Sequence, residues 1–88
     1  MSQTIEVCIK TAESTLFEGV AQSLSLINDA GPFDILPMHE NFISLISKNI
    51  RVTKIGGENI EFPIQSRGIL RAGSNKVTIF LGVEVVEG

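Results

Sequence analysis

Few side chains in this chain of 88 residues could perform acid–base or metal chemistry. The chain has one histidine, His39, and one cysteine, Cys8, which stand far apart in the sequence. A structural zinc site takes about four such ligands, so these two residues cannot supply one. His39 could act as the base of a Ser-His-Asp arrangement, but no nucleophile-elbow motif accompanies it. We therefore interpret His39 as a turn or interface residue.

Neither phosphate nor nucleic acid is a favoured ligand. The chain has no Walker-type or G-x-G-x-x-G loop, and Gly56, Gly57, Gly68 and Gly73 fall within expected hairpins. Seven basic against ten acidic residues give a net charge of −3, which argues against nucleic-acid binding. The single cysteine excludes an internal disulfide and suits a reducing compartment. No run of about 20 apolar residues could insert into a membrane. We expect no cofactor and no bound metal.

The elements that would position such residues are strands. From Thr4 to Lys10 the apolar residues Ile5, Val7 and Ile9 alternate with polar ones, which is typical of a half-buried strand. Cys8 lies on the polar side, where we interpret it as a small outer-face residue. Turn signals recur about every ten residues and no long helical pattern is present, so the sequence predicts one all-β domain over residues 1–88, a sandwich or a barrel.

Two hairpins can be placed by the faces that their apolar residues share. A three-residue loop at Gly56–Glu58 puts Val52 opposite Phe62. A two-residue loop would instead place the apolar residues of the two strands on opposite faces of the sheet. Pro63 cannot donate to a ladder, so its strand lies at an edge or is bulged there.

The last hairpin is expected to turn at Gly73–Ser74. That turn pairs Arg71 with Lys76 and Leu70 with Val77. The first pair joins like charges, which exposure screens.

The stretch Gly31–Ile46 is punctuated by Pro32 and Pro37 and contains the only histidine. It predicts a turn, a short strand through Phe33 to Leu36, a second turn and another strand. That last segment, Phe42–Ser47, is apolar on both parities. It is either a short helix or a strand covered on both faces, one of them by another protein.

Three motifs in this chain resemble one family. Phe33–His39 resembles the F-I-L-P-x-H-type signature of the ATP synthase epsilon subunit, in its N-terminal β-sandwich domain. Leu16–Gly19 resembles the upstream L-F-x-G motif, and Asn75–Ile79 resembles the late N-x-V-T-V strand. The three stand in the family's order and cover nearly the whole chain. The resemblance implies an all-β fold, a flattened antiparallel β-sandwich of about 8–10 short strands.

The resemblance also implies a function without chemistry of its own. In this family the sandwich is a central-stalk subunit between the gamma subunit and the membrane rotor ring of c subunits. It couples proton transport to ATP synthesis, as a peripheral part of the F1 sector on the cytoplasmic side of the inner membrane. The family's two C-terminal helices, which carry inhibition and in some members a nucleotide site, are not among these residues. We therefore expect no nucleotide binding and no enzymatic activity.

Two groups of candidate contact residues follow from the resemblance. The gamma-subunit interface is expected to consist of Met38, His39, Glu40, Phe42 and Ile46. The rotor-ring contact loop is expected to consist of Asn28, Asp29, Gly31, Pro32 and Asp34.

An alternative function is a small β-barrel enzyme or ligand carrier with a pocket near His39. The direction of the side chains in Phe42–Ile46 separates the two hypotheses. A flat outer patch favours the binding module, and a cavity favours the carrier.

Predicted core residues are large apolar side chains on the shared inner faces: Ile5, Val7, Leu24, Leu26, Val52, Phe62, Ile64, Val77, Ile79 and Leu81.

Overall fold

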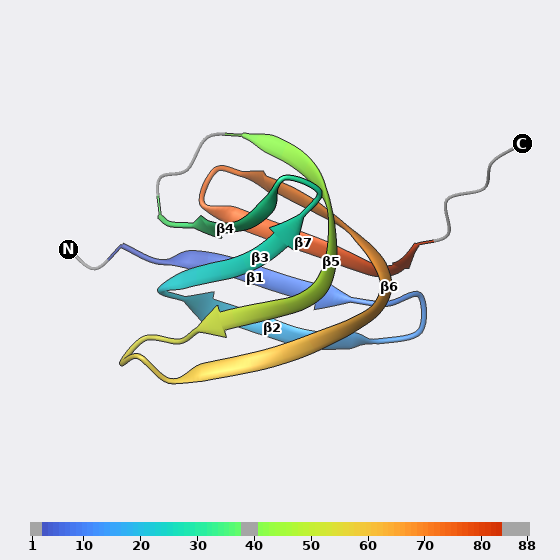
Figure 1. The fold of residues 1–88 in the computed structure, drawn as a ribbon. Helices are drawn as coiled ribbons and strands as arrows, with labels where there is room; N and C mark the ends of the chain where they lie inside the picture. Colours follow the sequence, from blue (N-terminus) through green and yellow to red (C-terminus); the bar gives the residue numbers. More distant parts are fainter. Residues whose placement is uncertain (1–2, 38–40, 84–88) are drawn as a thin grey trace, which may run out of the picture.

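The regular elements of the protein are all strands. The computed structural model describes residues 3–37 and 41–83. Its strands join in one hydrogen-bonded sheet in the order β2-β1-β7-β6-β5-β3-β4 (Figure 1). The all-β prediction is confirmed, and the described residues include no helix able to span a membrane. The strands are β1 (Ile5–Lys10), β2 (Thr15–Ala21), β3 (Ser23–Asn28), β4 (Gly31–Ile35), β5 (Phe42–Thr53), β6 (Asn59–Gly73) and β7 (Lys76–Val83).

Two long strands fold this sheet into a sandwich. β5 has 12 residues and β6 has 15. β3 pairs with the end of β5, at Arg51–Thr53, whereas β7 pairs with the end of β6, at Arg67–Gly73. One layer, the β3 layer, therefore holds β4, β3 and the adjoining halves of β5 and β6. The other, the β7 layer, holds β2, β1, β7 and the remaining halves. Figure 1 shows β5 and β6 curving from one layer to the other.

The bend in β5 has a local cause. The β5–β6 register shifts between Ser47 and Asn49, and Lys48 between them takes a φ of 71°. Such bulges bend a strand and increase its twist. Pro63 lies at the matching shift in β6, within the half that β7 does not pair with among the described residues. The prediction that Pro63 stands at an edge or bulge is confirmed.

The sheet differs from the expected one in two respects. It has fewer strands than predicted, because the expected breaks within β5 and β6 are bends in continuous strands. It is mixed and not purely antiparallel, because Glu6–Lys10 runs parallel to Lys76–Phe80.

The core lies between the two layers. Of the ten predicted core residues, seven are fully buried, and Phe62, Ile64 and Leu81 are half-buried against them. Two edge-to-face aromatic pairs connect the layers, Phe17 with Phe62 and Phe33 with Phe42, at centroid distances of 6.0 and 6.3 Å.

The β5–β6 hairpin has the predicted loop length in a different place. The Lys54 amide donates to the Glu58 carbonyl (2.7 Å), which makes Ile55–Gly57 the three-residue loop. The loop thus lies one residue earlier than predicted, and Val52 opposes Ile60 instead of Phe62. The apolar sets still share a face, because moving an odd loop by one residue preserves parity.

The β6–β7 hairpin turns one residue later than predicted. Ser74 and Asn75 have φ of 53° and 58°, as both central residues of a two-residue type I′ turn require. Arg71 consequently opposes Thr78, and the predicted Arg71–Lys76 pair does not form.

Candidate partner-binding surfaces

The segment Phe42–Ile46 is the start of β5, so the helical alternative is wrong. Ile43 is 71% exposed and Leu45 is 42% exposed, whereas Ile46 is 1% exposed. Phe42 is half-buried and packs on the core. One face of the strand therefore belongs to the core, and the other presents two aliphatic side chains to solvent.

This orientation corrects the predicted interface residue Ile46, which is fully buried, and turns the half-buried Phe42 toward the core. The side chains of Phe42 and Ile46 lie between the layers and are not the outer surface of β5. The expectation treated residues 42–47 as a separate strand. Ile46 shares its parity with the core residues Ile50 and Val52, so treating β5 as one strand would have turned Phe42 and Ile46 inward. The predicted residues Met38, His39 and Glu40 lie outside the described residues.

The register places the outward side chains of β5, β6 and β7 in cross-strand rows. Ile43 opposes Arg71, which opposes Thr78, and Leu45 opposes Ile69 of β6. Directly paired residues share a face, so these rows form one surface, here called the β5–β7 face. Its members are Ile43, Leu45, Ser47, Arg67, Ile69, Arg71, Gly73, Lys76, Thr78 and Phe80.

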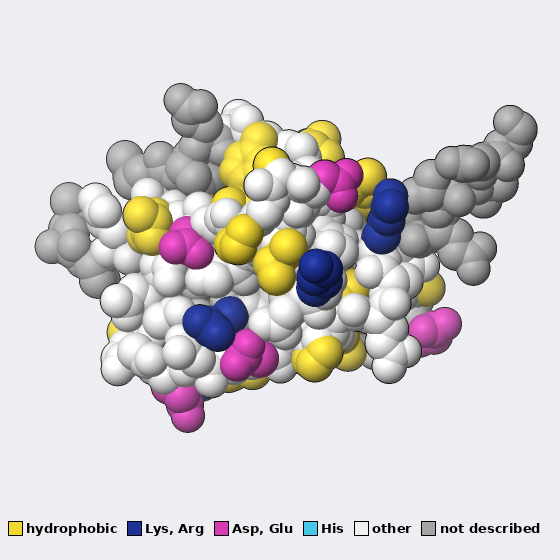
Figure 2. All heavy atoms as spheres, viewed as in Figure 1, with side chains coloured by type: hydrophobic (Ala, Val, Ile, Leu, Met, Phe, Trp, Pro, Cys, Tyr) yellow, Lys and Arg dark blue, Asp and Glu magenta, His cyan; other side chains and the backbone are white. Residues whose placement is uncertain are grey.

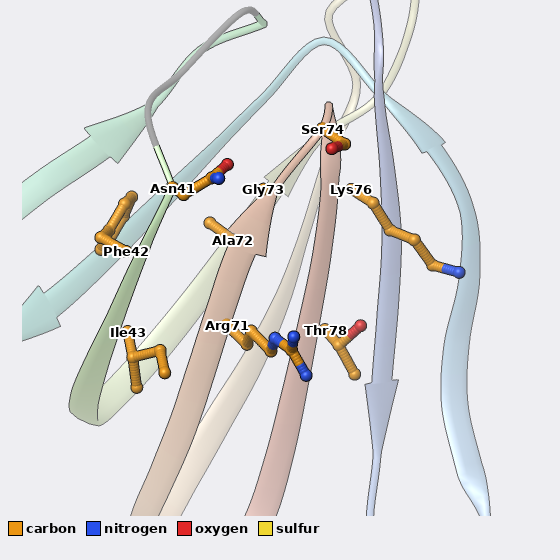
Figure 3. Close-up of a pocket in the computed structure, with 9 residues that line it drawn as sticks. All are labelled: Asn41, Phe42, Ile43, Arg71, Ala72, Gly73, Ser74, Lys76 and Thr78. Carbon is orange, nitrogen blue, oxygen red and sulfur yellow. The ribbon is translucent and has the colours of Figure 1, made fainter.

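One end of this face is hollowed beside the β6–β7 turn. The hollow has a volume of about 760 Å³ and is open to solvent (Figure 3). The Asn41 side chain packs over Gly73, where a Cβ would lie 2.7 Å from Oδ1 of Asn41. Ile43, Arg71 and Thr78 lie side by side along the length of the hollow (Figure 3). No polar side chain is buried among the described residues, so the hollow is a surface groove without the converging buried polar groups of a small-ligand pocket.

The predicted rotor-ring loop is shorter than the sequence indicated. The turn between β3 and β4 consists of Asp29 and Ala30, and Gly31 and Pro32 already belong to β4. Gly31 takes a φ of 116°, which favours glycine. Oδ1 of the Asn28 side chain accepts a hydrogen bond from the Ala30 backbone amide at 2.8 Å and closes the turn.

The two carboxylates of this hairpin lie apart. Asp29 is exposed at the tip, and Asp34 is exposed opposite Ser25 in the strand. Asp34 stands four positions after Ala30, the last residue of the turn, which is roughly 13 Å of strand at about 3.3 Å per residue. The tip lies beside β5, because the Asn28 side-chain amide donates to Oγ of Ser44 at 3.4 Å. Of the two carboxylates, only Asp29 is a residue of the turn itself.

No catalytic or metal centre emerges from the described residues. They contain no group of three or more His, Cys, Asp and Glu side chains placed to hold a metal ion. Their ion pairs are exposed, Arg51 with Glu61 at 3.6 Å and Lys54 with Glu58 at 3.7 Å. Figure 2 shows one face on which hydrophobic, basic and acidic side chains are mixed.

Comparison with known proteins identifies the family. The family model described as "ATP synthase, Delta/Epsilon chain, beta-sandwich domain" matches residues 4–84. The chain belongs to this family. The domain is 34% identical over 80 residues to the ATP synthase epsilon chain of Clostridium novyi, covering 90% of this chain and 60% of that one. It is 29% identical over 89 residues to the epsilon chain of Janthinobacterium, covering 100% of this chain and 64% of that one.

Solved structures share the fold. A chain of the Euglena gracilis mitochondrial ATP synthase, in a structure of OSCP, F1 and c-ring, superposes with a TM-score of 0.83 at 17% identity, covering 92% of this domain and 51% of that chain. A chain of the Tetrahymena thermophila central stalk and c-ring gives a TM-score of 0.69 at 12% identity, covering 91% and 64%. The domain thus spans less than two thirds of the length of these relatives.

Proposed function

We propose that this domain is a non-catalytic subunit module of an F-type ATP synthase. It links the gamma subunit of the central stalk to the membrane ring of c subunits and helps to couple proton transport to ATP synthesis. It works as a peripheral part of the F1 sector, on the cytoplasmic side of the inner membrane. Family membership and relatives named as epsilon chains support this proposal.

The observation that carries the proposal is the outward aliphatic pair of β5. Ile43 and Leu45 project from a sheet whose core is already complete without them. Leu45 forms an apolar row with Ile69 and with Phe80, which is 42% exposed, and Ile43 adds an apolar group in the next row. Exposed apolar groups that gather on one face of a small domain mark interaction sites. We assign this face to gamma, together with the preceding residues Met38, His39 and Glu40.

The β3–β4 hairpin is proposed as the rotor-ring contact. Asn28 fixes the turn and Asp29 presents a carboxylate at its tip, which suits a partner that offers short polar loops with a basic residue. An exposed ion pair contributes only about 0–1 kcal/mol, so Asp29 tunes this contact and does not create it.

The alternative, an enzyme or carrier with a pocket near His39, has less support. The side chains of Phe42–Ile46 divide between the core and the outer face, and the hollow that Phe42 and Ile43 help to line is a groove open to solvent. This favours a binding module over a ligand carrier.

The proposal can be tested with membranes stripped of their F1 sector. Adding the domain together with gamma and the remaining F1 subunits should restore ATP-driven proton pumping above the level seen without the domain. Equal pumping with and without the domain would exclude a linking role.

A further inference from the structure

Every charged side chain of the β5–β7 face is basic. Its charged members are Arg67, Arg71 and Lys76, whereas the chain as a whole carries −3. Building on the function proposed above, we propose that this face receives an acidic amphipathic helix of the partner subunit. The helix carboxylates pair with Arg71 and Lys76, and its apolar side chains rest on Ile43 and Leu45.

The basic groups are available for such a partner. All three are exposed, and neither of the two ion pairs among the described residues includes them. Glu6 is the Cα partner of Lys76 on β1, yet the two form no ion pair within the described structure. In Figure 3 Arg71 lies beside Thr78 along the groove, and Lys76 extends toward β1. Exposed cations without an ion pair in the domain steer an anionic partner toward this face and give the contact specificity.

The shape of the face suits a helix. Neighbouring strands lie about 4.8 Å apart, so β5 to β7 spans roughly 10 Å, close to the diameter of an α-helix with its side chains. The groove lined by Asn41, Gly73 and Lys76 leaves room for a partner at the end of the face beside the β6–β7 turn. A helix crossing there meets aliphatic groups on one side and cations on the other.

The borders of the face set the orientation of the helix. Nζ of Lys10 lies 5.0 Å from the centroid of the Phe80 ring and adds a basic group at the β1 border. Glu6, the cross-strand partner of Lys76 on β1, and Glu18, the partner of Cys8 on β2, also face outward. They would repel a uniformly anionic lipid surface, and they confine an acidic helix to the β5–β7 side of Lys76.

The test compares two double variants, one with both charges of this face reversed and one with two charges of the other layer reversed. Arg71→Glu with Lys76→Glu changes the β5–β7 face. Arg51→Glu with Lys54→Glu makes the same change in net charge on the β5–β6 hairpin of the other layer. Affinity for purified gamma is measured by calorimetry at low and high salt, with thermal unfolding as a check on folding.

We expect the first variant to bind gamma about tenfold or more weakly at low salt and to lose most of the salt dependence of the wild type. The control should bind within about twofold of the wild type. If the first variant binds gamma as tightly as the wild type does, the acidic-helix proposal is overturned and the proposed function still stands. No binding by the wild type itself refutes the proposed function.

A second arm uses defined probes. A synthetic amphipathic helix with glutamates on one side and leucines on the other should bind the wild-type domain, and the same peptide with lysines should not. If neither peptide binds, or if phosphatidylglycerol vesicles bind in a manner that depends on Arg71 while the acidic peptide does not, the proposal is wrong.

Discussion

Ile43 and Ile46 offer a matched pair, because one residue type on one strand points to opposite sides. Truncation of Ile43 to Ala removes three carbons, worth about 0.8 kcal/mol each when buried, or about 2.4 kcal/mol. Since 71% of Ile43 is exposed and available for burial, Ile43→Ala should weaken gamma binding by about 1.7 kcal/mol, roughly 15- to 20-fold. Its effect on unfolding should stay within about 0.5 kcal/mol.

Ile46→Ala should do the reverse. Ile46 is fully buried opposite Gly68, so its truncation should cost about 2–5 kcal/mol of the stability of the domain. Any domain that remains folded should bind gamma within about threefold of the wild type. Calorimetry for binding and thermal unfolding by circular dichroism measure both quantities. Gamma affinity that survives Ile43→Ala unchanged would refute the assignment of the outer face of β5.

Three further predictions concern packing, the hairpin and nucleotide. Gly68→Ala should destabilise the domain by about 1–3 kcal/mol in thermal unfolding, because the new Cβ would lie 2.9 Å from Leu81 and 3.2 Å from the Phe80 carbonyl; Gly19→Ala, with its nearest neighbour at 3.5 Å, is the control and should be near neutral. Asp29→Lys should lower coupled proton pumping and spare gamma binding, whereas Asp34→Lys, away from the turn, should change neither. Calorimetry with ATP should give no micromolar binding to this domain, since it has no glycine-rich phosphate loop.

Local alternation predicted the strands and most of the core. Ile5, Val7 and Ile9 show a period of two, and each is buried as that pattern requires. The parallel pairing of β1 with β7 could not be predicted in this way, because it joins distant segments and no local sequence pattern in either strand indicates it. The continuity of β5 was hidden by its polar stretch Ser47–Asn49, which reads as a break and is a bulge.

The turns show what parity can and cannot decide. The Gly56–Gly57 dipeptide fits a loop beginning at Ile55 or at Gly56, and both place the same apolar residues on the same face. Only the Lys54–Glu58 hydrogen bond distinguishes them. The same limit applied to the candidate interface. Phe42–Ile46 has apolar residues on both parities, and the choice of inner face depends on Ile46 packing where Gly68 leaves room.

In the proposed function, the domain is a subunit module that docks on gamma. A calorimetric titration of the purified domain with purified gamma from the same organism tests it most directly. We predict a saturable one-to-one complex with a Kd in the micromolar range or tighter, about −8 kcal/mol or better. The absence of binding heat and of co-elution at concentrations of about 100 µM, for which the free energy of binding would be weaker than roughly −5.5 kcal/mol, would contradict it.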